Sequence, residues 1–327
     1  MDTFRTIINI HKQDLQITHE DPVLFLGSCF AGNIGKRMQL LKFKARVNPF
    51  GVIFNPSSVA NSVRLLAEGK IFSKEDLFLF KGLWSCFNHH GSFSNPDPNA
   101  CLDEINKELT SGTEMLKQCK VISVTFGTAW IFKHRESGTV VANCHKLPES
   151  SFSRQLLKPE EIVKEYSELI KSLRSQNPEV KLLFTVSPVR HLRDGMEGNQ
   201  FSKSILHMAV RKIIEDNENC FYFPAYEIMM DDLRDYRFYD EDMVHPNKQA
   251  IDYIWERFEY AFMDKNTKAI NQEMAKLVSA MSHRPLHPEG NEFRVFCETQ
   301  LKFVRDLKTK YPDLSFEKEE NYFSRSI

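Results

Sequence analysis

Three side chains in the sequence could together perform nucleophilic catalysis: Ser28, Asp242 and His245. A serine hydroxyl is a weak nucleophile until a neighbouring base removes its proton, and that base needs a carboxylate to orient it. Asp242 and His245 stand three residues apart, so the carboxylate can accept from one imidazole nitrogen and leave the other facing a serine. Both could equally be ordinary polar residues of a surface turn, because short Asp-x-x-His patterns are common by chance.

Ser28 stands where a strand-like run turns into a predicted helix. Gly27 lets the chain bend, and a helix beginning near Gly32 would direct its N-terminal amides toward a developing oxyanion. The alternative is that Ser28 only caps this helix, because serine is a favoured N-cap residue. The neighbouring Cys29 is a second possible nucleophile, but adjacent side chains at such a turn point in different directions. We expect the cysteine to be the one that faces the core.

Continuous apolar runs of strand length alternate with helical patterns along the chain. The runs expected to form strands are 23–27, 121–126, 181–186 and 220–223. The segments expected to form helices are 32–41, 57–68, 100–119, 158–176 and 199–217. Because such strands are apolar on both faces, we predict a doubly wound α/β fold with a parallel sheet. Two aromatic-rich, turn-punctuated segments, 71–95 and 129–142, predict hairpins inserted above the sheet.

The candidate residues should meet at one edge of this sheet. In open parallel sheets, ligands bind at the carboxyl ends of the strands. Three polar features are expected there: Gly27-Ser28 after the first strand, Gly127-Thr128 after a central strand, and the segment from Asp242 to His245 before the last core helix. Pro246 fits the first turn of that helix.

After about residue 264 the pattern becomes wholly helical. We therefore expect residues 1–264 to form the catalytic α/β domain and residues 265–327 to form a helical extension packed on its core. A subunit contact is the alternative use of the extension.

The composition disfavours several functional classes. A net charge of −1 gives no electrostatic reason to expect a nucleic acid or a membrane surface as partner. No run approaches the ~20 apolar residues of a membrane helix. Neither G-x-G-x-x-G nor G-x-x-x-x-G-K-[ST] follows a strand, which disfavours nucleotide binding, and no cofactor is expected. Cys86, His89 and His90 fit no standard zinc spacing, so no metal site is expected.

The N-terminal residues and the cysteines bear on location. Residues 1–16 lack the basic-then-apolar pattern of a secretory signal. The seven cysteines are scattered and include no C-x-x-C pair, which favours reduced thiols over disulfides. Both observations predict a cytoplasmic protein.

Six sequence blocks, in order, resemble the GSCFA family, a branch similar to the SGNH (GDSL-like) hydrolases. The first is the segment Gly27–Ala31 (GSCFA), which carries the family's signature. The others are Asn48–Gly51 with Asn55-Pro56, Thr125–Trp130 (TFGTAW), Asn143–Lys146 (NCHK), Ser187–His191 (SPVRH) with Asp194-Gly195, and Asp242–Asn247 (DMVHPN). The resemblance spans residues 23 to about 250 and continues loosely into the helical tail.

The resemblance implies a three-layer flavodoxin-like sandwich and a catalytic triad that maps to Ser28, Asp242 and His245. Relatives form the oxyanion hole from the serine amide, a glycine amide of the second block and an asparagine side chain of the third. Gly51 is the matching glycine, although a turn after Pro49-Phe50 would equally need a glycine there.

The third block departs from the SGNH pattern Gly-x-Asn-Asp, because this chain has Gly127-Thr128-Ala129-Trp130 there. Two residues could replace the missing asparagine: Thr128 through its hydroxyl, or Asn143 from the end of the following hairpin. We favour Asn143, since the strand-like residues before it would return to the same rim. Losing one oxyanion donor typically costs about 3 kcal/mol of transition-state stabilisation, so a site without it would be slow or inactive.

His191, His145 and Gly127 are candidates for substrate binding near this edge. His191 follows the strand 181–186 and could contact substrate or fix its own loop through hydrogen bonds. His145 has the same two possible roles.

Together these features predict a serine esterase that cleaves an ester or O-acyl group of a small molecule or glycan through an acyl-Ser28 intermediate. An acyltransferase would use the same site with an alcohol in place of water. A catalytically inactive ligand-binding α/β domain is the alternative of a different class, and the altered third block favours it.

Overall fold

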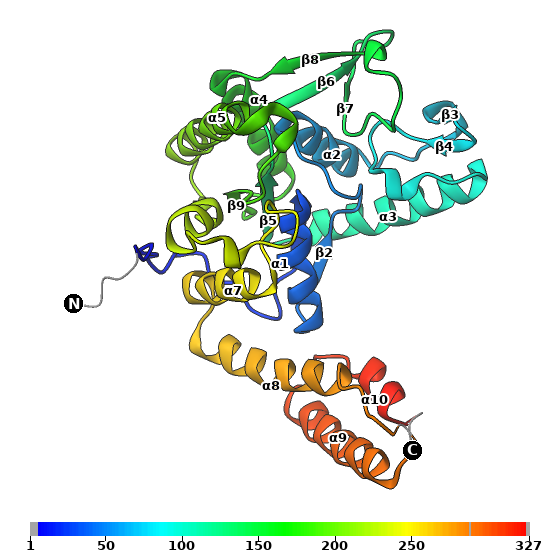
Figure 1. Cartoon of the computed structure of the whole chain (residues 1–327), viewed down its shortest axis with the longest axis vertical. Coiled ribbons are helices and arrows are strands. Elements are labelled where there is room, and N and C mark those ends of the chain that lie inside the picture. Colours follow the sequence, from blue (N-terminus) through cyan, green and yellow to red (C-terminus); the bar gives the residue numbers. More distant parts are fainter. Residues whose placement is uncertain (1–5, 288, 325–327) are drawn as a thin grey trace.

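A five-stranded parallel sheet forms the centre of the computed structural model, which describes residues 6–287 and 289–324 (Figure 1). The strand order is β10-β9-β5-β1-β2. The strands are β1 (Val23–Gly27), β2 (Ala45–Val47), β5 (Val121–Phe126), β9 (Lys181–Val186) and β10 (Cys220–Tyr222). Numbered by their appearance in this sheet, the strands follow the order 2-1-3-4-5, which is that of flavodoxin-like folds. The predicted α/β fold is confirmed.

Helices cover both faces of the sheet and make it a three-layer sandwich. Alternate residues of β1 point to opposite faces, so that Val23 and Phe25 join one buried cluster and Leu24 and Leu26 the other. The first cluster includes residues of α1 (Cys29–Leu40) and α7 (Lys248–Phe262). The second includes residues of α2 (Pro56–Glu68), α3 (Pro98–Gln118), α4 (Pro159–Gln176) and α5 (Gly195–Asp216). Each fully buried leucine or phenylalanine contributes about 1.5–3 kcal/mol.

The helix starts differ from the sequence predictions in two places that matter for the site. α1 begins at Cys29 rather than near Gly32, because the Ser28 side chain caps it. α7 begins at Lys248 with Asn247 as its N-cap, so Pro246 lies before the helix instead of in its first turn. α1 therefore starts directly after Ser28, and α7 starts just after the loop that carries Asp242 and His245.

Two small antiparallel sheets are inserted around the main one; the predicted hairpin segments 71–95 and 129–142 hold all their strands except β8, which follows the second segment. The hairpin of β3 (Phe78–Phe80) and β4 (Leu83–Ser85) lies near α3 (Figure 1). The second sheet has the order β7-β6-β8, with β6 (Trp130–His134), β7 (Val140–Val141) and β8 (Phe152–Leu156). In Figure 1 it lies at the top, beside α2 and α4.

The C-terminal residues form α8 (Lys265–Met281), α9 (Asn291–Lys310) and α10 (Glu317–Ser324), which extend below the sheet in Figure 1. Their buried residues belong to the same cluster as α1 and α7. The Lys42 ammonium also pairs with Glu319 at 2.6 Å. No helix in the described part of the chain has both the length and the apolarity needed to cross a membrane. Residues 1–5 of the N-terminal stretch considered above lie outside the described residues.

Candidate active site

The carboxyl ends of β1 and β5 form the switch point of the sheet. The chain leaves β1 toward β2 on one side and later returns to β5 on the other side. Ligands of open α/β sheets bind in the crevice at such a point. Ser28 follows β1 directly and Gly127 follows β5, so the fold brings these two predicted site residues to the same edge.

Gly27 fixes the turn that presents Ser28. Its φ is +132°, and a Cβ at this position would lie 2.1 Å from the Thr125 carbonyl oxygen. Its N–H donates to Asn48 Oδ1 at 2.9 Å, and its carbonyl accepts from the Ile53 amide at 2.9 Å. Only glycine fits this position, and Asn48, which the sequence analysis names only as part of a family block, is a positioning residue.

Ser28 caps α1 and is buried. Its Oγ accepts from the Phe30 amide at 3.3 Å, while its own N–H donates to the Thr125 carbonyl at 3.1 Å. Only 1% of the residue is exposed. The capping role considered above is therefore present, and it leaves Oγ at the positive end of the helix.

The prediction that Cys29 faces the core was wrong. Cys29 is half-buried and lines a surface pocket of about 520 Å³ together with Asn48 and Gly51, whereas Ser28 is the covered residue. The extended N-cap conformation turns the Ser28 side chain back over the first-turn amides, and the next residue then points outward. Burial raises the pKa of the Cys29 thiol.

Asp242 and His245 form the predicted pair in the loop before α7. The Asp242 Oδ2 lies 2.5 Å from His245 Nδ1, which must be the donor because an ionised carboxylate only accepts. The other carboxylate oxygen accepts the amides of Val244 and His245, both at 2.9 Å. These backbone hydrogen bonds are the main reason that the pKa of Asp242 falls to about 2. The aspartate is therefore charged, and it orients His245 through Nδ1, while Nε2 has no hydrogen bond to any residue that the structure describes.

No hydrogen bond joins Ser28 to His245 among the residues that the structure describes. The loop is nevertheless close to this edge, because the Asp242 carboxylate acts electrostatically on the Cys29 thiol. The side chains of Asp242 and His245 are 49% and 43% exposed, so the pair is open to solvent. Catalytic hydrogen bonds are often long without substrate and tighten only when it binds.

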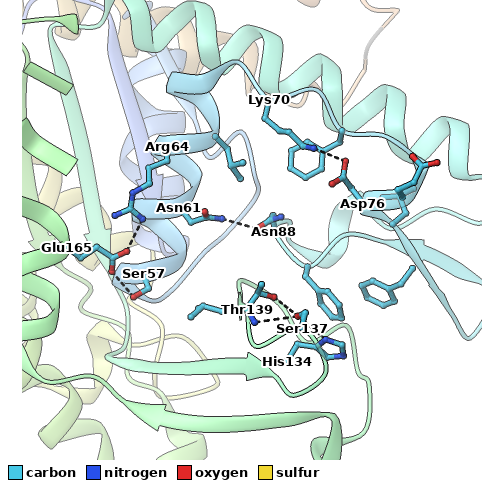
Figure 2. Close-up of a pocket in the computed structure, with 17 residues that line it drawn as sticks. Ser57, Asn61, Arg64, Lys70, Asp76, Asn88, His134, Ser137, Thr139 and Glu165 are labelled. Carbon is cyan, nitrogen blue, oxygen red and sulfur yellow. Dashed lines mark hydrogen bonds and ion pairs between the residues drawn. The ribbon is translucent and has the colours of Figure 1, made fainter. Parts of the chain in front are cut away.

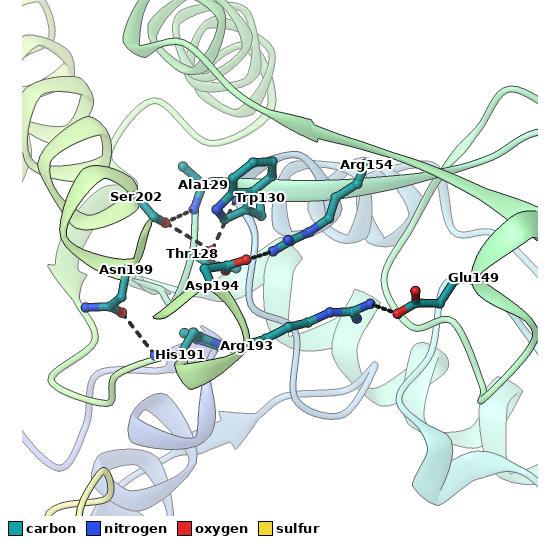
Figure 3. A network of polar contacts seen from close by, with 10 residues as sticks. All are labelled: Thr128, Ala129, Trp130, Glu149, Arg154, His191, Arg193, Asp194, Asn199 and Ser202. Carbon is teal, nitrogen blue, oxygen red and sulfur yellow. Dashed lines mark hydrogen bonds and ion pairs between the residues drawn. The ribbon is translucent and has the colours of Figure 1, made fainter. Parts of the chain in front are cut away.

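Two of the groups predicted for the oxyanion hole, the amides of Ser28 and Gly51, donate to backbone carbonyls, and the side chains of Thr128 and Asn143 each make a polar contact. The Gly51 N–H donates to the Asn48 carbonyl at 2.7 Å, and its φ of +75° fits the turn alternative. The Thr128 hydroxyl lies 3.0 Å from the Ser202 hydroxyl, as Figure 3 shows. Asn143 Oδ1 accepts the amide of His145 at 2.8 Å.

The first turn of α1 offers other donors. Within the described part of the chain, the amides of Cys29 and Ala31 donate no backbone hydrogen bond, while those of Phe30 and Gly32 are bound by Ser28. Helix N-termini leave such orphan donors at their positive end. Sequence reasoning missed them because it placed the helix start three residues too late.

His191 lies directly over the end of β5. Its Nε2 is 3.0 Å from the point where a Cβ on Gly127 would lie, and its ring packs edge-on against Phe54 at 5.2 Å between centroids. Burial is the main cause that lowers its pKa to about 4, so the ring is neutral at pH 7. The described residues provide no hydrogen-bond partner for either ring nitrogen, so both can contact a ligand.

The loop that carries His191 is tied to the β7-β6-β8 sheet. Asp194 pairs with Arg154, and the Arg154 guanidinium lies 4.1 Å from the centroid of the Trp130 ring (Figure 3). Arg193 pairs with Glu149 from the same insertion. The insertion thus holds this loop at the edge of the main sheet.

His145 has a structural role. One ring nitrogen, Nε2, bonds the Cys86 carbonyl at 2.8 Å, and the ring packs against Phe78. It therefore joins the β3–β4 hairpin to the end of β7 instead of facing the triad.

A buried lysine lies beneath the site. The Lys203 Nζ donates to the carbonyls of Gly127 at 2.8 Å and Ser187 at 2.7 Å, so it links the ends of β5 and β9. Desolvation is the main cause that lowers the pKa of this fully buried amine to about 7. Its spacing from Leu206 and Val210, which matches the inner face of α5, is the one sequence signal that could have revealed it.

Comparison with known proteins identifies the family to which the chain belongs. No curated protein matches the chain. Among solved structures, an acetyl xylan esterase (Est2A) from the rumen bacterium Butyrivibrio proteoclasticus is similar, with 12% sequence identity and a TM-score of 0.35 over 76% of this chain and 67% of that one. The model of the GSCFA family matches residues 22–258, and that of the GSCFA domain protein C-terminal domain matches residues 274–327. The chain therefore belongs to the GSCFA family.

Proposed function

We propose that this protein is a serine hydrolase that cleaves an ester or O-acyl group through an acyl-Ser28 intermediate. One observation supports the proposal most: Asp242 is in contact with His245, and its carboxylate acts electrostatically on Cys29, the residue next to Ser28. All seven cysteines are free thiols, the state favoured in the cytoplasm, where we propose that the protein acts.

The proposed reaction proceeds in two halves. His245 Nε2 takes the Ser28 proton as Oγ attacks the acyl carbon, and it then gives this proton to the departing alcohol. Water next attacks the acyl-serine, with His245 again taking and returning the proton, and the carboxylic acid leaves. Asp242 keeps the imidazole in one tautomer and stabilises the imidazolium. In an acyltransferase, a second alcohol would replace water.

The oxyanion of each tetrahedral intermediate is assigned to the first turn of α1. The amides of Cys29 and Ala31 lie in the first turn of α1, at the positive end of the helix, and the described residues give them no backbone acceptor. Such donors are effective because they are fixed before charge develops. This assignment replaces the amides of Ser28 and Gly51, which already donate to backbone carbonyls.

A ligand-binding domain without catalysis is the second candidate. It is favoured by the burial of Ser28 and by the hydrogen bond from its amide to Thr125, which removes that amide from an oxyanion hole. In that case the serine would serve only as the helix cap.

Covalent labelling with a fluorophosphonate separates the two candidates. We expect mass spectrometry to locate the label on Ser28, and Ser28→Ala and His245→Ala to abolish it. The matched controls Ser175→Ala and His287→Ala change an exposed serine and an exposed histidine and should label like the wild type. A folded wild-type protein that takes no label would support the binding domain instead.

A further inference from the structure

A second cavity, of about 820 Å³, opens between α2 and the two inserted sheets (Figure 2). Ser28, Asp242 and His245 are not among its lining residues. Its volume falls in the range of about 300–1,000 Å³ that is typical of small-molecule sites. The walls combine charged pairs, amides, hydroxyls and aromatic rings, and each group restricts the kind of ligand that fits.

The charged side chains disfavour an anionic ligand. Arg64 pairs with Glu165 at 3.0 Å, and the same carboxylate accepts the Ser57 hydroxyl at 2.8 Å. Lys70 pairs with Asp76 at 3.1 Å. Figure 2 shows both pairs on the cavity wall. Because each cation that lines the cavity already faces a carboxylate, an anionic ligand would find no uncompensated positive charge.

The uncharged polar groups offer donors and acceptors side by side. Asn61 donates to Asn88 Oδ1 at 2.9 Å, which joins α2 to the loop after β4. The hydroxyls of Ser137 and Thr139, from the β6–β7 turn, lie 2.7 Å apart. A hydroxyl both donates and accepts, so neighbouring hydroxyls of one ligand can bridge such pairs. These walls therefore suit a polyhydroxylated molecule.

A column of aromatic rings adds an apolar wall. The Phe87 ring stacks on Phe78 with centroids 4.2 Å apart, and its centroid lies 4.8 Å from that of the His134 ring. All three residues line the cavity and are half-buried. The electron-rich faces of such rings attract the weakly polar C–H groups of a sugar ring. An aromatic wall beside paired hydrogen-bonding groups matches a molecule with one C–H face and a rim of hydroxyls.

We propose that this cavity is a binding site for a neutral saccharide. The bound sugar rests on the aromatic column and shares its hydroxyls with Asn61, Asn88 and the β6–β7 turn. Binding at this site does not depend on catalysis by Ser28.

The test measures binding in the full-length Ser28→Ala protein, so that hydrolysis cannot alter the ligand. The probes are maltose, cellobiose, xylobiose and chitobiose, followed by saturation-transfer NMR and calorimetry, with a glucuronic acid disaccharide as the anionic comparator. We expect at least one neutral disaccharide to bind and the anionic one to bind more weakly.

The variant Asn61→Ala/Asn88→Ala removes both partners of one hydrogen bond together, so neither amide is left unpaired. We expect it to keep its thermal midpoint and to bind the same sugar about tenfold more weakly or not at all. The control Asn99→Ala changes an exposed asparagine of α3 outside the cavity and should bind normally. Absence of binding by every neutral probe, preference for the anionic sugar, or unchanged binding in the double variant would each overturn the proposal. Fluorophosphonate labelling of the Ser28-containing protein tests the hydrolase separately.

Discussion

The Asp242 carboxylate is held by three hydrogen bonds, and this sets its proposed part in catalysis. Two come from backbone amides and one from His245, and together they keep its pKa near 2. The carboxylate is therefore ionised at any pH above about 3. We expect its removal to slow the reaction of Ser28 at every pH from 6 to 9.

The variant Asp242→Asn should label with fluorophosphonate about 10²–10⁴ times more slowly than the wild type, because the amide no longer fixes the reactive tautomer of His245. The rate of labelling is followed at pH 6 to 9. The neighbouring exposed Glu241→Gln is the control and should label at the wild-type rate. Equal rates for Asp242→Asn and the wild type would show that the aspartate does not support the histidine.

His89 is a second residue with a clear physical consequence. Its ring is buried among Phe50, Phe72 and Phe93, and the described residues provide no partner for either ring nitrogen. Desolvation lowers its pKa from 6.5 to about 3. Between those pH values the unfolded chain binds more protons at this residue than the folded protein. Stability should therefore fall as the pH drops below 6.5.

The variant His89→Leu should be about 1 kcal/mol more stable at pH 7, because it removes two buried nitrogens that lack partners. It should also lose less stability than the wild type between pH 6.5 and pH 5. Urea midpoints at both pH values measure these effects, and the exposed His287→Leu is the control. An unchanged acid slope in His89→Leu would assign the pH dependence to other groups, such as His191 and His207, whose pKa values are also lowered to about 4.

At the scale of elements, the central sheet could be predicted closely from the sequence. Its strands are apolar on both faces, so the runs 121–126 and 181–186 coincide with β5 and β9. The strands β2 and β8 gave no such signal, because they are short and their residues are mostly half-buried or exposed. Their positions follow from the neighbouring strands and not from their own composition.

The candidate site was less predictable than the fold. Ser28, Asp242 and His245 could be chosen by residue type, and the last two are in contact. The proposed oxyanion donors are backbone amides. Which amides lack a hydrogen-bond partner depends on the residue at which the helix starts, and a shift of one residue changes them. Lys203 shows the same limit, because a lysine in a helical pattern usually faces solvent.

The hydrogen bonds by which Lys203 links the ends of β5 and β9 should stabilise the folded protein. The variant Lys203→Met leaves the carbonyls of Gly127 and Ser187 without their side-chain donor and should lower the free energy of unfolding by about 1–3 kcal/mol at pH 8. Lys212→Met removes an exposed lysine of the same helix and should leave the free energy of unfolding essentially unchanged.

The pH dependence provides an independent check. Because the pKa of Lys203 falls from 10.5 to about 7, the folded protein binds fewer protons there than the unfolded chain between these values. The stability of the wild type should gain from this residue as the pH rises from 7 to 9, and Lys203→Met should lose that gain. Urea titrations at pH 7 and 9 would contradict the assignment if both proteins changed equally.

At the scale of the whole molecule, the helical extension and the α/β part share one buried cluster. Residues such as Met274, Leu277 and Phe316 belong to the same cluster as Phe25 and Trp255. Helices α8 to α10 therefore bury apolar surface against α1 and α7. Because burial of this kind is cooperative, we expect the full chain to unfold in one transition and not in two.

The ion pair between Lys42 and Glu319 tests this coupling. The Lys42 side chain is 15% exposed and that of Glu319 is 7% exposed, so the pair is largely desolvated. Lys42→Met leaves the Glu319 charge buried without its partner, which should destabilise the protein by about 3 kcal/mol. Replacing both, as Lys42→Met/Glu319→Leu, removes the buried charge and should recover most of that loss.

Urea unfolding followed by circular dichroism measures the four corners of this double-mutant cycle, with the exposed Lys36→Met as the control. A coupling energy well above the 0–1 kcal/mol of surface pairs is expected, and every variant should still show a single transition. If Lys42→Met instead produced a separate early transition for the helices of residues 265–324, the extension would be a unit that folds on its own. A midpoint equal to that of the wild type would show that the pair does not hold the extension in place.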